Sequence, residues 1–114
     1  MLTLYMPFNI FSLFEVIGEK FREKEKDAIK DYLEYLKSQV DFIQKLIKEN
    51  RCNLIKDIDL DKTLFDLDKT KKKVKSYLNK EKDEEIKKLV DEIYTYLLKY
   101  EFSISQLWAC NENS

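Results

Sequence analysis

The sequence predicts an all-α protein, and three observations support that fold class. Its 114 residues include one glycine and one proline, too few for the tight turns of β-sandwiches and barrels or for phosphate-cradling loops. Apolar residues recur every three or four positions over long stretches, which is typical of amphipathic helices. Few polar segments interrupt this apolar periodicity. We therefore expect one domain, residues 1–114, folded as an antiparallel helical bundle of three to five helices with a long or kinked N-terminal helix.

The first predicted helix extends from about residue 9 to Asn50. No proline follows Pro7, and one apolar stripe continues along the whole segment. The stripe contains Phe14, Ile17, Phe21, Ala28, Tyr32, Leu36, Val40, Ile43 and Ile47. Gly18 lies within it, and a glycine destabilises a helix interior by about 1 kcal/mol relative to alanine. The segment is therefore either one long helix or two helices that meet near Gly18.

A connection and a second helix follow. Residues 50–53 break the periodicity, and residues 54–61 are predicted to form an ordered connection, with strand-like alternation of apolar and acidic residues at 57–61. Asp59 or Asp61 can cap the next helix, because their side chains accept hydrogen bonds from free backbone N–H groups. The predicted inner side of this helix carries Leu64, Leu67, Val74, Tyr77 and Leu78.

Residues 79–82 predict a short turn before a third helix. Asp83 is its predicted N-cap, and acidic residues in the first turn interact favourably with the helix dipole. The predicted inner stripe consists of Ile86, Leu89, Val90, Ile93, Leu97 and Tyr100. The apolar residues in the stretch from Phe102 to Trp108 predict a short final helix that packs on the rest.

Charge is unevenly distributed although the formal net charge is only −1. Residues 50–82 carry ten basic side chains against six acidic ones, whereas residues 83–114 carry three against seven. We expect these two stretches to attract each other within the fold or across a dimer, which reduces the need for an external polyanion.

The two cysteines, Cys52 and Cys110, lie too far apart in sequence for a CxxC redox or zinc motif. Small secreted scaffolds usually carry more cysteines, so we expect two free thiols in a reducing compartment and a cytoplasmic location. The uncharged residues before Glu15 lack the preceding basic region of a signal peptide. Polar residues and Pro7 also interrupt that stretch, which argues against a membrane-spanning helix.

The composition argues against catalysis. The chain has no histidine, which removes the usual general base near neutral pH and the commonest metal ligand. Asp57, Asp59 and Asp61 have the spacing of the first calcium ligands in an EF-hand loop, but Lys62 replaces the required glycine and Asp68 the final glutamate. We expect no enzyme activity, no cofactor and no metal site.

An apolar segment near the N-terminus is the main candidate binding surface. Residues 8–17 are apolar on nearly every side, and a helix of that kind needs cover all round. Aromatic residues also concentrate near the C-terminus, which an antiparallel arrangement would bring close. The predicted contact residues for a protein partner or a second copy are Phe8, Phe11, Phe14, Ile17 and Trp108. Burial within the monomer and attachment to a membrane surface are the alternatives for residues 8–17.

A run of lysines on the second helix is a candidate nucleic-acid surface. It contains Lys69, Lys71, Lys72, Lys73 and Lys75, with Lys80 and Lys82 beyond them. Such a cluster can contact phosphates without sequence preference, but a pI near 5.6 is unusual for a dedicated binder. The leading prediction is therefore a small non-catalytic interaction module of the adaptor, inhibitor or immunity type that forms a homo-oligomer or binds another protein. An accessory nucleic-acid-binding subunit and a peripheral membrane protein are the alternatives.

Overall fold

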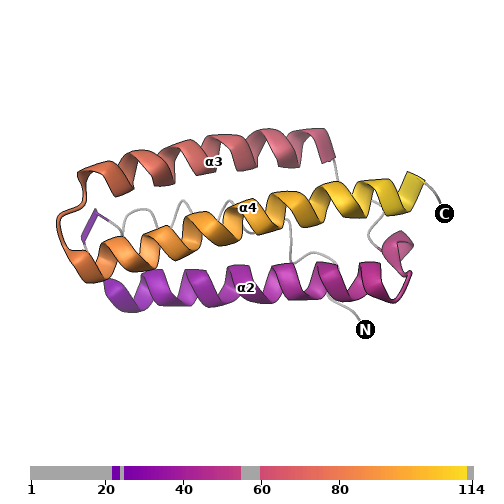
Figure 1. Cartoon of the computed structure of the whole chain (residues 1–114), viewed down its shortest axis with the longest axis horizontal. Coiled ribbons are helices and arrows are strands. Elements are labelled where there is room, and N and C mark those ends of the chain that lie inside the picture. Colours follow the sequence, from indigo (N-terminus) through magenta and orange to yellow (C-terminus); the bar gives the residue numbers. More distant parts are fainter. Residues whose placement is uncertain (1–21, 24, 55–59, 113–114) are drawn as a thin grey trace.

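The computed structural model describes residues 22–23, 25–54 and 60–112, and the regular secondary structure of this part of the chain is entirely helical (Figure 1). Its elements are the α-helices α2 (Lys26–Lys48), α3 (Leu60–Lys80) and α4 (Glu84–Glu112), with the short 3-10 helix η2 (Cys52–Leu54) between α2 and α3. The predicted all-α class is confirmed. Most of the part of the first predicted helix that precedes α2, including Gly18, lies outside the described residues, as does most of the predicted strand-like connection.

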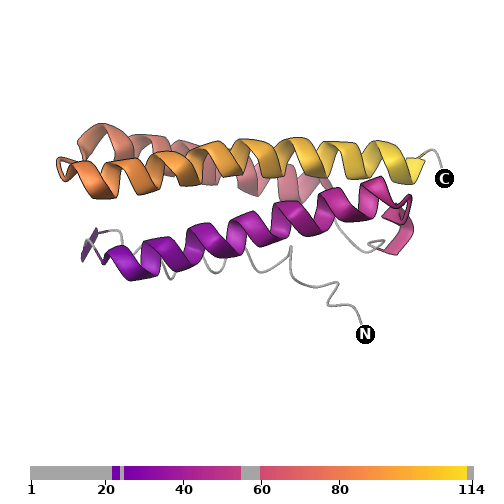
Figure 2. The ribbon, with the colours of Figure 1, turned by 60° about the horizontal axis from the view of Figure 1, so that its bottom comes forward.

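The helix α4 lies between α2 and α3 and packs against both (Figures 1 and 2). Following the chain in Figure 1, α2 and α4 run in the same direction and α3 runs in the opposite one. Cross-helix contacts give the same directions, because Lys26 pairs with Glu85 at one end and Gln44 bonds Ser103 towards the other. The larger bundle of three to five antiparallel helices stays a prediction.

The end of α2 shows why the chain turns where the sequence predicted a break. Asn50 adopts a positive φ of 56°, a conformation that asparagine tolerates better than most residues. The backbone N–H of Asn50 donates to the Ile47 carbonyl at 3.1 Å, and that of Arg51 donates to the Leu46 carbonyl at 2.8 Å. This pair of bonds is a Schellman motif, which satisfies carbonyls at the helix end and redirects the chain into η2.

In the connection between α3 and α4, the predicted cap is confirmed and the predicted turn is displaced. The side chain of Asp83 accepts hydrogen bonds from the backbone N–H groups of Glu85 at 3.0 Å and Ile86 at 3.2 Å, so it is the N-cap of α4. The predicted turn at residues 79–82 is displaced, because α3 continues through Lys80 and residues 81–83 make the connection.

The predicted separate helix near the C-terminus is wrong. One continuous helix, α4, covers all 29 residues from Glu84 to Glu112. No glycine or proline follows Gly18, so nothing in this stretch ends the helix after Tyr100. At 1.5 Å per residue α4 is about 43 Å long, close to the 47 Å longest dimension of the molecule.

The core lies between the facing sides of the three helices, as the apolar stripes predicted. Tyr32 and Tyr100 are its largest fully buried side chains. The buried hydrophobic residues are Ile29, Tyr32, Leu33, Leu36, Val40, Ile43, Leu46, Cys52, Leu67, Val74, Ile86, Val90, Ile93, Leu97, Tyr100, Ile104 and Leu107. The remaining predicted inner residues in the described part, such as Ala28, Leu64 and Leu89, are partly buried against this core.

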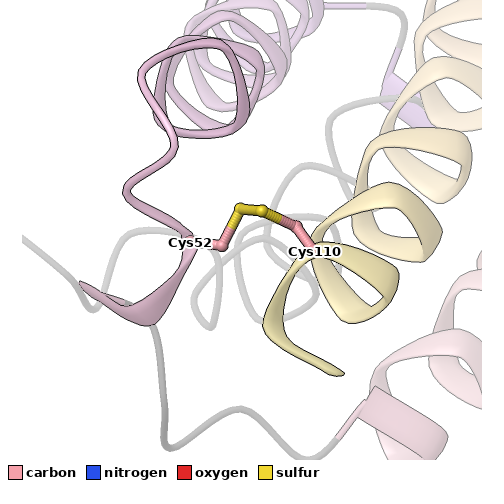
Figure 3. Close-up of a disulfide and its surroundings, with 2 residues drawn as sticks. All are labelled: Cys52 and Cys110. Atoms are coloured by element: carbon pink, nitrogen blue, oxygen red, sulfur yellow. A yellow bond between two sulfur atoms is a disulfide. The ribbon is translucent and has the colours of Figure 1, made fainter. Parts of the chain in front are cut away.

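The two cysteines form a disulfide, so the prediction of free thiols is wrong (Figure 3). Cys52 in η2 is joined to Cys110 in the last turns of α4, with 6.0 Å between their Cα atoms. The physical reason is the parallel pairing of α2 and α4. Contacts between these helices join residues about 59 positions apart, as in Lys26 with Glu85 and Gln44 with Ser103. The 58-residue separation of the cysteines matches that offset, which brings the thiols together.

Candidate functional site

The predicted partner-binding residues divide between the described part of the chain and the rest. Phe8, Phe11, Phe14 and Ile17 lie outside the described residues. Trp108 lies on α4, and 53% of its surface is exposed. Of the predicted contact set, the structure therefore places Trp108 at the surface.

Three of the four exposed large hydrophobic side chains in the described part belong to α4. They are Leu98, Phe102 and Trp108, of which Phe102 is 63% exposed. Leu98 and Phe102 are four residues apart and so lie on the same face of the helix. Phe102 belongs to the apolar stretch from which a helix was predicted, but neither Leu98 nor Phe102 was predicted as a contact residue.

These side chains belong to an uncharged strip that follows the outer face of α4. We define the α4 strip as Thr95, Leu98, Phe102, Ser105 and Ala109, which are all exposed. Their spacing of three and four residues keeps them on one face. The residues that α4 contributes to the core over the same stretch are Ile93, Leu97, Tyr100, Ile104 and Leu107. The C-terminal half of α4 therefore has apolar residues on two opposite faces, of which only one is covered.

The other aromatic residues of this half are covered. Tyr100 is fully buried, whereas Tyr94 and Tyr96 are partly buried against the core. The Lys75 ammonium lies 5.2 Å from the centre of the Tyr94 ring, and Lys99 lies 4.5 Å from that of Tyr96. Lysine stems and cation–π contacts thus cover these rings, which leaves Phe102 and Trp108 as the open aromatic side chains of α4.

The fourth exposed large hydrophobic, Phe65, has different surroundings. It lies on α3 and is 62% exposed. The Lys69 ammonium lies 5.4 Å from its ring centre, and Asp61, Lys62, Asp66, Asp68 and Lys72 surround it in sequence. Single exposed apolar residues on a charged surface are common and do not indicate a contact site.

The predicted lysine cluster is dispersed over two sides of α3. Lys71 and Lys75 face α4, where Lys71 bonds Glu101 at 2.9 Å and Lys75 contacts the Tyr94 ring. On the outer side, Lys72 pairs with Asp68 at 3.0 Å, Lys69 contacts Phe65, and Lys73 is exposed. Four of the five candidate lysines thus have partners within the chain. The Lys71–Glu101 bond is one ion pair of the kind predicted between the basic stretch and the acidic one.

The shifted pKa values in the described part do not provide a general base near neutral pH. Burial is the main cause that raises the pKa of the Tyr32 and Tyr100 hydroxyls, and neighbouring Tyr35 raises both further. Burial, followed by the nearby Glu81 carboxylate, raises the pKa of Tyr77 to about 12. The hydrogen bond with Lys26 lowers the pKa of Glu85 and in turn raises that of Lys26. These tyrosines therefore stay protonated and Glu85 stays ionised at neutral pH.

The described residues show neither a cluster of metal-ligating side chains nor a membrane-spanning helix. No group of three or more histidine, cysteine or carboxylate side chains in residues 25–54 and 60–112 is arranged to hold a metal ion. No helix within the described ranges is both long enough and apolar enough to cross a membrane.

Comparisons with known proteins do not assign the chain to a family. No family model matches it, and no curated protein or solved structure is significantly similar to it.

Proposed function

We propose that this chain is a non-catalytic protein–protein interaction module that associates with a second copy of itself through the α4 strip and Trp108. One observation carries the proposal. A long helix whose inner face forms the core also exposes Leu98 and Phe102 on its outer face, along a strip without charged residues, and exposes Trp108 elsewhere on the same helix. The predicted apolar residues 8–17, within the larger predicted bundle, are the second part of the proposed contact surface.

The composition of the strip suits a helical partner. A spacing of three and four residues lets one helix insert side chains between those of another. Phenylalanine and tryptophan bury large apolar areas, and tryptophan is enriched among the residues that dominate binding energy. Ser105 and Ala109 are small and continue the strip beyond Phe102, so they permit close approach of a partner helix.

Sedimentation velocity tests self-association. We expect wild type to form dimers or larger assemblies and a Leu98→Ser, Phe102→Ser variant to be monomeric, because each lost apolar side chain removes about 1.5–3 kcal/mol of burial. Phe65→Ser is the matched control, since Phe65 has the same exposure on a charged face. A second variant, Phe11→Ser with Phe14→Ser, measures the contribution of the N-terminal segment. Wild type that stays monomeric at its highest soluble concentration would contradict the proposal.

The alternatives from the sequence have less support. Nucleic-acid binding by Lys69, Lys71, Lys72, Lys73 and Lys75 would have to compete with the ion pairs that Lys71 and Lys72 make within the chain, and these five lysines are dispersed over two sides of α3. Membrane attachment relies on residues 8–17, which lie outside the described part. The cytoplasmic location stays a prediction, but the disulfide removes its basis in free thiols, because disulfides persist mainly in oxidising environments.

A further inference from the structure

A cleft lies between α3 and α4, near the connection that joins them. Its volume is about 550 Å³, within the range typical of small-molecule sites. Lys75, Leu78 and Asn79 line it from α3, and Glu84, Lys87, Lys88 and Asp91 line it from α4. Leu78 is half-buried and the other six side chains are exposed, so the cleft has one apolar wall and a polar rim.

The acidic side chains around this cleft are mostly engaged within the chain. Glu85 pairs with Lys26 at 2.6 Å, and Asp83 caps the first turn of α4. Glu81 is buried and accepts a hydrogen bond from the Tyr77 hydroxyl at 3.3 Å. Three of the five carboxylates between residues 81 and 91 are therefore held elsewhere, which leaves Glu84 and Asp91 at the cleft.

The lysines of the same region are not neutralised in this way. Within the described residues, Lys75, Lys87 and Lys88 form no ion pair, and neither do Lys80 and Lys82 in and beside the connection. Lys75 contacts the Tyr94 ring, which leaves its ammonium hydrogens available to another acceptor. Of the side chains that line the cleft, three are lysines and two are carboxylates, so the lining carries one net positive charge although the whole chain is slightly acidic.

We propose that this cleft binds the phosphate groups of a ligand. Lys75 from one helix and Lys87 and Lys88 from the other supply charged donors, and the Asn79 side chain supplies an amide donor. Glu84 and Asp91 accept hydrogen bonds from hydroxyl or amino groups on the rest of the ligand and oppose its phosphates. The site is independent of the α4 strip, and it replaces the predicted lysine run with a set drawn from both helices.

Titration of the ¹⁵N-labelled full chain with sodium pyrophosphate at low salt tests the site. We expect saturable amide shifts confined to residues 75–91, weakened by added salt. Lys75→Gln with Lys87→Gln should weaken binding about tenfold, and Asp91→Asn should strengthen it about threefold, because the first removes attraction and the second removes repulsion. The matched control is Lys45→Gln with Lys48→Gln, two exposed lysines near the far end of α2, and it should bind as wild type does.

Two further titrations identify the source of the phosphate. A nucleoside triphosphate represents a free ligand, and a short single-stranded oligonucleotide represents a nucleic-acid backbone. The probe that binds more tightly and shifts the amides at the cleft identifies the source of the phosphate. Absence of localised shifts with pyrophosphate, nucleotide and oligonucleotide at low salt overturns the proposal. An equal loss of binding in the control variant, with circular dichroism showing intact helices, also overturns it, because general positive charge would then explain the attraction.

Discussion

The outer faces of α3 and α4 each expose a phenylalanine to the same extent, 62% for Phe65 and 63% for Phe102. Their surroundings differ. Phe65 lies among charged residues under the Lys69 ammonium, whereas Phe102 continues an uncharged strip with Leu98 and has Trp108 on the same helix. The difference shows that exposure by itself does not mark a contact surface. A contiguous run of uncharged neighbours is the feature on which the proposed contact surface rests, because such a run offers a partner more apolar area.

The largest expected effect comes from the disulfide, which joins the last turns of α4 to η2. No disulfide holds α3. Reduction, or Cys52→Ala with Cys110→Ala, should cost about 4 kcal/mol of unfolding free energy, because the bond closes a loop of 58 positions and limits the unfolded chain. Urea unfolding with and without reductant measures this. The alanine variant should not respond to reductant, and an unchanged midpoint for wild type would show that the bond does not form in solution.

The next prediction compares the buried face and the exposed face of α4 by substituting two adjacent leucines. Leu97 is fully buried and Leu98 is 42% exposed. Leu97→Ala should destabilise the fold by about 2–5 kcal/mol, since it leaves a cavity in the core, and Leu98→Ala by less than about 0.5 kcal/mol. Thermal unfolding of both variants, at a protein concentration where wild type is monomeric, compares them. If Leu98→Ala were as costly as Leu97→Ala, the α4 strip would be covered rather than open.

The smallest effect compares the charged N-terminal end of α4 with the uncharged α4 strip. The Lys26 hydrogen bond lowers the pKa of Glu85 below its ordinary 4.5, so this pair contributes stability above that pH. The contribution should disappear as the pH falls through the lowered value and the carboxylate protonates. Both groups are exposed, so we expect a small difference between wild type and Glu85→Gln that disappears in acid. Glu84→Gln, which breaks no ion pair in the described part, should show no such pH dependence.

Much of the fold followed from local patterns in the sequence. The scarcity of glycine and proline and the three-to-four-residue spacing predicted helices. Asp83 was predicted as a cap and the break after Asn50 was located, because caps and helix ends depend on a few neighbouring residues. The α4 strip was harder to predict from such local patterns. In the C-terminal half of α4, apolar residues occupy two faces, and periodicity does not say which face the core covers.

The sequence by itself determined that the described part of this chain is helical, where α2 ends, where α3 and α4 begin, and which residues of α2 and α3 face inward. Each of these depends on contacts within about four residues, since helix hydrogen bonds and caps are local. Only the tertiary structure decided that Cys52 meets Cys110, that Lys71 is bound to Glu101, and that Leu98 and Phe102 stay open. Those outcomes depend on the parallel pairing of α2 with α4 and the antiparallel pairing of α3 with α4, which join residues 30 to 62 positions apart.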